Sequence, residues 1–260
     1  MNTKVVILCG GRGTRLKEET EFRPKPMVEI GGKPILWHIM KIYASYGFND
    51  FVLCLGYKGE MIKEYFLNYE TMNNDLTIKL DEKDHVEFHS KHLERNWKID
   101  LVDTGLNSNT GARIKKIEKY IDGDLFMMTY GDGVADVNIK DLFSFHEAQK
   151  TLATVTGVHP SSRFGELIIK GNKVVKFSEK PRTSQGFING GFFVLNRKIF
   201  QYLDNKDECD MERDILEKIA AQGQLAVYTH EGFWQCMDTQ RELDLLTELW
   251  AQSNAPWKVW

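Results

Sequence analysis

Residues 4–16 read K-V-V-I-L-C-G-G-R-G-T-R-L, an apolar run that leads into a loop with three glycines. The run at residues 4–9 is rich in β-branched side chains and ends at a glycine, which predicts a buried strand. Gly10, Gly11 and Gly13 allow the backbone of the loop to approach another group closely. A strand followed by such a loop indicates an α/β protein that binds a ligand beyond the carboxyl end of its first strand.

The remainder of the chain continues the alternation of strands and helices. Helices are predicted at residues 34–46 and 59–69, and strands at residues 51–55 and 125–130, the second of which runs into the turn at 131–133. This order predicts parallel strands joined by right-handed crossovers. We therefore expect an α/β fold with a Rossmann-like, mixed but mostly parallel central sheet flanked by helices. Further strands are expected at residues 153–158, 167–170, 174–177 and 191–195, and further helices at residues 212–222 and 241–250.

Residues 71–109 depart from this alternation, because they are polar and hold short strand-like pieces at 77–80, 86–89 and 98–102. We interpret them as a small β-rich insertion within a single domain of residues 1–260. Insertions of this kind often form subunit contacts, so we expect a homo-oligomer.

Three histidines in this insertion, His85, His89 and His92, have the spacing H-x-x-x-H-x-x-H. In a polar segment such a pattern is typical of a solvated surface. A metal site is the alternative, although no cysteine or carboxylate set completes it.

The composition excludes several classes of protein. Hydrophobic residues make up 42% of the 260 residues and charged residues 27%, as in an ordinary globular protein. The net charge of −3 leaves no basic excess for a nucleic acid, and no segment approaches the roughly 20 apolar residues of a membrane span. The four cysteines form no C-x-x-C pair and no targeting signal is present, so we expect a reduced, cytoplasmic protein.

Three interpretations of the glycine loop are weak. A Walker A loop requires G-x-x-x-x-G-K-[ST], but the only Gly-Lys pair, at residues 32–33, precedes Pro34. A dinucleotide fingerprint requires a third glycine where the chain has Leu16, and no helix is predicted to open there. A plain surface turn does not explain why Arg15 and Lys25 crowd the same short segment.

A fourth interpretation accounts for more of the chain. The pattern G-G-x-G-T-R-L followed by P-K-P resembles the opening signature of the nucleotidyltransferases that make nucleotide sugars, a family with a glycosyltransferase-A-like fold. Four further blocks occur in that family's order, and five short motifs in register are far more specific than one. They are G-D-G at residues 131–133, F-S-E-K-P at 177–181, N-G-G-F-F at 189–193 and W-Q-C-M-D-T at 234–239.

The resemblance implies a role for each motif. The glycine loop would wrap a nucleoside triphosphate with its backbone N–H groups. Arg15 and Lys25 would be the catalytic residues, with Arg15 on the β- and γ-phosphates and Lys25 on the α-phosphate. Asp132 and Asp238 match the family's metal ligands, which makes Mg²⁺ the expected cofactor. Two larger sets follow from the same match: a nucleotide-binding set of Leu8, Cys9, Gly10, Gly11, Arg12, Gly13, Thr14, Arg15, Lys25, Ser108, Arg113 and Gly131, and a sugar-phosphate-binding set of Glu179, Lys180, Asn189 and Gly190.

The chemistry of such a reaction agrees with the side chains present. The phosphate oxygen of a sugar 1-phosphate attacks the α-phosphorus of the triphosphate, and pyrophosphate leaves in line. A phosphate monoester has a second pKa near ~6, so the nucleophile is already ionised at neutral pH and needs no general base. Catalysis then consists mostly of positioning and electrostatic stabilisation.

Finer details indicate one branch of the family. The stretches at residues 23–40, 101–105, 110–113 and 255–260 resemble the members that use CTP and glucose 1-phosphate, whereas thymidylyl-transferring relatives typically have Lys-Gln in place of the Lys-Pro at 25–26. That branch implies CDP-glucose as the product, a precursor of dideoxy sugars in bacterial surface polysaccharides such as O antigen. It also implies a hexamer. Arg113 would donate either to the acceptor edge of cytosine or to the phosphates.

Two alternatives remain at this stage. The first is the same chemistry with dTTP, UTP or another sugar 1-phosphate. The second is a non-catalytic protein that binds nucleotide sugars, although a binding module has no need for Arg15, Lys25, Asp132 and Asp238 together.

Overall fold

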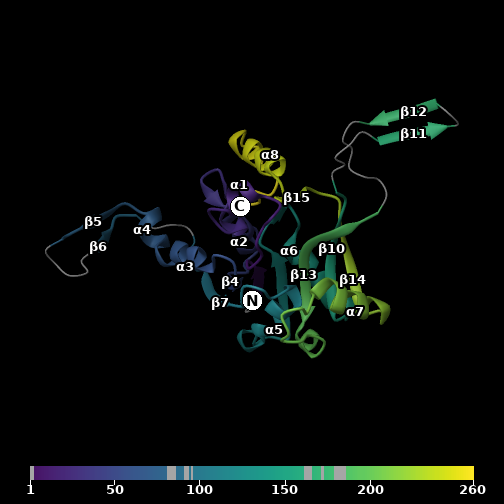
Figure 1. Ribbon diagram of the computed structural model, residues 1–260, viewed down its shortest axis with the longest axis horizontal. Helices are drawn as coiled ribbons and strands as arrows, with labels where there is room; N and C mark the ends of the chain where they lie inside the picture. The colour runs from purple at the N-terminus through teal and green to yellow at the C-terminus, as the bar shows by residue number, and fades with distance from the viewer. Residues whose placement is uncertain are drawn as a thin grey trace.

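The computed structural model describes residues 3–80, 86–90, 94, 96–160, 166–170, 173–178 and 186–260, and a seven-stranded sheet forms its centre (Figure 1). From one edge to the other, the strands are β14 (Leu225–His230), β10 (Ala153–Val158), β13 (Ile188–Asn196), β8 (Leu125–Tyr130), β1 (Lys4–Leu8), β4 (Asp50–Leu55) and β7 (Lys98–Asp103). Six of these strands point the same way, and β13 runs antiparallel to both of its neighbours. The predicted fold class is therefore confirmed.

Successive side chains of each strand point to opposite faces of the sheet. Both faces therefore carry apolar side chains, and helices cover both. In β1, Val5 and Ile7 belong to one apolar core, which also holds side chains of α2 (Ile35–Ser45), α6 (Ile139–Gln149) and α8 (Gln240–Ala251). Val6 and Leu8 belong to the other core, which holds side chains of α5 (Thr110–Lys116), of the π-helix η4 (Met211–Leu216) and of α7 (Glu217–Ala221). Two packed cores thus fix the strands whose ends carry the functional loops.

Two hairpins project from opposite sides of this body, as Figure 1 shows. One pairs β5 (Leu76–Ile78) with β6 (Val86–Phe88), beyond α3 (Gly59–Leu67) and α4 (Tyr69–Asn73). The other pairs β11 (Glu166–Lys170) with β12 (Lys173–Ser178). The shorter elements are α1 (Lys17–Thr20), η1 (Lys25–Met27), β2 (Glu29–Ile30), β3 (Lys33–Pro34), η2 (Glu118–Tyr120), β9 (Gly133–Ala135), η3 (Arg197–Gln201) and β15 (Trp234–Cys236).

The structure changes the predicted limits of the insertion. Residues 98–102 were assigned to it, but β7 pairs in parallel with β4 and belongs to the central sheet. The reason is that β7 is an edge strand with partly exposed side chains, so its sequence alternates between polar and apolar residues and resembles a peripheral hairpin. The helices predicted at 59–69 and 212–222 are each divided in two, as α3 with α4 and as η4 with α7.

The carboxyl ends of the parallel strands meet at one edge of the sheet, where ligands bind in folds of this type. Strand β13 contributes to the same edge with its beginning, because it runs the other way. Phe192 pairs with Thr129 of β8, so the residues just before Phe192 lie beside the residues that follow β8. Among the described residues, no helix is long and apolar enough to cross a membrane.

The C-terminal segment packs against α2 around a buried histidine. His38 is fully buried, its Nε2 lies 2.9 Å from the Ile30 carbonyl oxygen, and Trp257 Nε1 donates to its Nδ1 over 3.4 Å. The rings of Trp250 and Trp260 also contact the imidazole. Burial lowers the pKa of His38 to about 4, so the neutral ring is the form that fits this packing.

Candidate active site

A cavity of about 580 Å³ lies at the carboxyl edge of the sheet, within the size range of small-molecule sites. It brings together the glycine loop, the turn after β8, the beginning of β13 and the turn after β15. Most of the predicted residues line it. These are Leu8, Cys9, Gly10, Gly11, Gly13, Thr14, Arg15, Lys25, Ser108, Arg113, Gly131, Asp132, Asn189, Gly190 and Asp238.

Three glycines of the loop differ in what a side chain would meet. A Cβ on Gly10 would lie 2.0 Å from Arg113 Nη1, and Gly13 has a φ of +62° that disfavours other residues. Around Gly11, by contrast, no described atom lies within 4 Å of the Cβ position, apart from those of Gly11 and its two neighbours in the chain. The protein itself therefore requires glycine at positions 10 and 13, while the space over Gly11 is open to a ligand.

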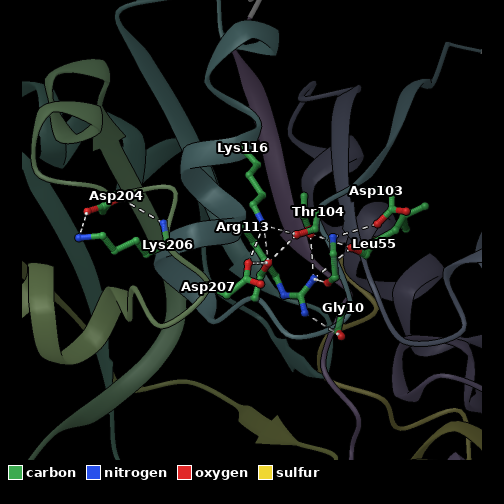
Figure 2. Close-up of polar contacts among 11 residues, drawn as sticks. Gly10, Leu55, Asp103, Thr104, Arg113, Lys116, Asp204, Lys206 and Asp207 are labelled. Carbon is green, nitrogen blue, oxygen red and sulfur yellow. Dashed lines mark hydrogen bonds and ion pairs between the residues drawn. The ribbon is translucent and has the colours of Figure 1, made fainter.

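Arg113 is almost fully buried, and its guanidinium is bound by backbone carbonyls (Figure 2). Nη1 donates to the carbonyl oxygens of Leu55 and Gly105 over 3.1 and 2.8 Å and to Thr104 Oγ1 over 2.8 Å, and Nη2 donates to Gly10 O over 3.1 Å. Burial lowers the pKa of Arg113. The side chain joins the glycine loop to the ends of β4 and β7, and these bonds leave at most two of its five N–H groups for a ligand.

Ser108 belongs to a second polar cluster with Lys116 and Asp207, two residues that Figure 2 shows beside Arg113. Its hydroxyl lies 2.6 Å from both the Thr104 carbonyl oxygen and Asp207 Oδ1 and accepts from Lys116 Nζ over 2.7 Å. The hydrogen bonds from Lys116 and Ser108 hold the pKa of Asp207 below its usual range. Ser108 thus lines the cavity while its polar atom bonds within the protein.

Two carboxylates and two cations meet at the other end of the cavity. Lys25 Nζ lies 2.6 Å from Asp132 Oδ2 and also donates to Asp238 Oδ1, and Arg15 Nη1 lies 2.8 Å from Asp238 Oδ2. Lys25 is buried, which by itself lowers its pKa, but the two carboxylates outweigh burial and the pKa is raised. Lys25 therefore stays charged, and the four formal charges cancel.

The same carboxylates fit a divalent cation. Asp132 follows β8 and Asp238 follows β15, and both converge on one positive charge, the ammonium group of Lys25. Among the described residues, no cluster of three or more His, Cys, Asp and Glu side chains forms a complete metal site. Two carboxylates alone suit Mg²⁺, which commonly takes one or two carboxylates together with phosphate oxygens and water.

The sugar-phosphate set is only partly visible. Asn189 and Gly190 lie at the beginning of β13, and Trp234 Nε1 donates to the Gly190 carbonyl oxygen over 2.7 Å. Glu179 and Lys180 lie outside the described residues, so their predicted role stays a prediction.

Two other predictions concern residues away from the cavity. Arg12 is not among the described residues that line the cavity. Its guanidinium donates to Asn107 Oδ1 over 3.2 Å. His89 Nε2 lies 2.8 Å from Thr77 Oγ1 across the β5–β6 hairpin, at an exposed position, while His85 and His92 lie outside the described residues.

Several residues that line the cavity were not among the site residues predicted from the sequence. Tyr130 immediately precedes the Gly131-Asp132 turn, so its place at the end of a predicted strand was a usable signal. Trp234 and Cys236 precede Asp238 in the same way. Thr110 and Asp210 carry no such signal, because neither follows a predicted strand: Thr110 begins α5 and Asp210 is the N-cap of η4.

Comparisons with known proteins agree with this geometry. A family model described as nucleotidyl transferase matches residues 4–245. The glucose-1-phosphate cytidylyltransferase of Salmonella typhimurium is 50% identical over 258 residues that cover 99% of each chain. The probable glucose-1-phosphate cytidylyltransferase of Bacillus subtilis is 47% identical over 257 residues, which cover 99% of this chain and 100% of that one. The crystal structure of HddC from Yersinia pseudotuberculosis complexed with GMP-PN has a TM-score of 0.68 and 26% identity, and covers 95% of this chain and 99% of that chain.

Proposed function

Because the chain belongs to the nucleotidyl transferase family, we propose that it transfers the cytidylyl group of CTP to glucose 1-phosphate, which yields CDP-glucose and pyrophosphate. The observation that carries the reaction type is the meeting of Lys25, Arg15, Asp132 and Asp238 beside the glycine loop. The choice of CTP and glucose 1-phosphate rests on the names of the relatives that are 47% and 50% identical over the whole chain.

In this proposal the bond between the sugar-phosphate oxygen and the α-phosphorus forms as the bond from that phosphorus to the leaving pyrophosphate breaks. Two anions must approach each other, so fixed positive charge is the main requirement. Lys25 supplies it on the α-phosphate, at a buried point held by the prolines on either side. Arg15, whose side chain is largely exposed, donates to the β- and γ-phosphates at the mouth of the cavity.

The glycine loop binds the triphosphate through backbone N–H groups, and the open space over Gly11 supports a close approach there. Asp132 and Asp238 would hold Mg²⁺, which would neutralise phosphate charge. With these carboxylates on the ion, Lys25 and Arg15 would be free to donate to the phosphates. Asn189 and Gly190 would then bind the sugar.

The decisive experiment measures pyrophosphate release. The protein is mixed with Mg²⁺, glucose 1-phosphate and each nucleoside triphosphate in turn. We expect release with CTP. Release only with dTTP, UTP or GTP would contradict the assignment of the base, and no release with any sugar 1-phosphate would favour a non-catalytic nucleotide-sugar-binding protein. Replacement of Mg²⁺ by Mn²⁺ or by chelator tests the metal.

We further propose a single domain of residues 1–260, supported by a central sheet whose strands come from Lys4 to His230. A homo-oligomer, with a hexamer as the specific expectation, is supported by apolar side chains on the projecting β5–β6 hairpin, where Ile78 and Val86 are 54% and 42% exposed. The mass of the particle in solution tests it. A cytoplasmic site of action agrees with four free cysteines, and a role in surface polysaccharide synthesis follows from the product.

A further inference from the structure

A chain of hydrogen bonds runs from the cavity into the protein through Tyr130. Asn189 Nδ2 donates to Tyr130 Oη over 3.0 Å, and Tyr130 Oη donates to Glu212 Oε1. Thr110 Oγ1 donates to the second oxygen of the same carboxylate over 2.7 Å. An ionised carboxylate can only accept, so Glu212 sets the direction of every bond in the chain.

This direction fixes the amide of Asn189. The backbone N–H of Gly191 donates to Asn189 Oδ1 over 2.9 Å, while Nδ2 donates to Tyr130. A flipped amide would place a donor against a donor at Gly191, and it would leave Tyr130 without the donor that it now accepts. Among the described residues, the amide therefore keeps one N–H and one lone pair unbound, and Asn189 is exposed and lines the cavity.

The ring of Tyr130 holds the same segment. Gly191 has a φ of +81°, and a Cβ there would lie 2.6 Å from Tyr130 Cδ2, so the ring packs directly against the glycine. A phenolic hydroxyl keeps its proton at neutral pH, so Tyr130 Oη can donate to the Glu212 carboxylate.

The setting of Glu212 is unusual for a carboxylate. Within the described part of the chain, no lysine or arginine forms an ion pair with it, and two hydroxyl groups satisfy its oxygens instead. It lies on the π-helix η4, whose N-cap Asp210 also lines the cavity, and π-helical turns occur frequently at functional sites. A carboxylate bound in this way serves to orient the hydroxyl groups that donate to it.

We propose that Tyr130 and Glu212 are positioning residues, which hold the Asn189 amide in the single orientation that a hydroxyl of the sugar phosphate requires. The inference rests on the proposed function, since it needs glucose 1-phosphate as the second substrate. Both residues act through Asn189. Their effect should therefore appear on the sugar phosphate and not on CTP.

The test compares Y130F, which keeps the ring and removes the hydroxyl, with E212Q, which keeps the shape and introduces a donor. The steady-state KM for each substrate and the kcat are measured by pyrophosphate release. We expect Y130F to raise the KM for glucose 1-phosphate about fivefold to tenfold, the effect of one lost hydrogen bond, and to change the KM for CTP less than twofold. E212Q should likewise raise the KM for glucose 1-phosphate and change the KM for CTP less than twofold. Y202F, which removes a hydroxyl that donates to Gln222 over 3.2 Å on the exposed surface, is the matched control.

Deoxy analogues of glucose 1-phosphate identify the hydroxyl group. With the analogue that lacks the hydroxyl bound by Asn189, wild type and Y130F should have the same KM, whereas the other analogues should keep the difference. An equal rise of both KM values, an unchanged KM for glucose 1-phosphate in both variants, or the same penalty with every analogue would overturn the inference. If Y130F does not fold, E212Q decides by the same criteria. Wild type that releases no pyrophosphate would overturn the proposed function itself, whereas the other outcomes affect only the roles of Tyr130 and Glu212.

Discussion

The two sides of the cavity are built from strands of opposite direction. On the side proposed to bind the nucleotide, called the nucleotide side below, β1, β4 and β7 are parallel, and the buried guanidinium of Arg113 joins the loops that follow them. On the side proposed to bind the sugar, called the sugar side below, β13 is antiparallel, and aromatic side chains from β8 and β15 hold its first residues. The nucleotide loop is thus anchored through backbone carbonyls and the sugar segment through Tyr130 and Trp234, so substitutions should separate binding of the two substrates.

The largest expected effect lies where the two sides meet, at Lys25. K25A removes the positive charge proposed to act on the α-phosphate, so kcat should fall by roughly 10²- to 10³-fold while the KM for CTP changes far less. Steady-state pyrophosphate release measures both values. K17A, at an exposed lysine of α1, is the control. An unchanged kcat in K25A would remove Lys25 from the mechanism.

Two substitutions on the nucleotide side, G10A and G11A, test whether the protein or the ligand requires glycine at each position. In G10A the new methyl group would meet Arg113, so we expect a loss of about 2 kcal/mol, or roughly 4–8 °C in Tm. In G11A the methyl group enters open space, so Tm should stay unchanged while the KM for CTP rises. Thermal unfolding and kinetics of both variants decide this. A Tm that falls equally in both would show that Gly11 is also required by the protein.

The packing of α2 against the C-terminal segment around His38 should weaken in mild acid, which lowers the free energy of unfolding. The unfolded state takes up a proton on His38 near pH 6.5, whereas the folded state does so only near about 4, so the contribution is complete above pH 6.5 and is lost as pH falls towards 4. We expect a loss of about 2 kcal/mol between pH 7 and pH 5 from this residue. Urea unfolding measures it, and H38Q should be less stable at pH 7 but less sensitive to pH. Equal pH dependence in both proteins would contradict the assignment.

The smallest expected effect tests the sugar side directly. N189A removes the amide that faces the cavity, so the KM for glucose 1-phosphate should rise about tenfold and the KM for CTP should change less than twofold. N196A is a suitable control, because Asn196 lies at the far end of the same strand. A larger effect on CTP than on the sugar phosphate would break the division between the two sides.

The sequence located the loops on the nucleotide side better than the segment on the sugar side, for a physical reason. The glycine loop and the turn at Asp132 each follow an apolar strand, and hydrophobic periodicity locates such strands. Asn189 lies at the beginning of β13 and does not follow a strand. Neither periodicity nor composition reveals that β13 is reversed, so only the family resemblance pointed to Asn189. Residue types also did not show that backbone carbonyls would surround Arg113, because those bonds depend on tertiary structure.

The pairing of Lys25 and Arg15 with Asp132 and Asp238 has a consequence for the order of events. In this structure each of these four charged side chains is already paired with one of opposite charge. A free cation must displace Lys25 from both carboxylates, and a free triphosphate must draw both cations away from them. A cation–triphosphate complex carries both signs and would offer every one of these groups a new partner at once. Under the proposed function, the site would therefore favour the metal complex of the nucleotide over either component alone.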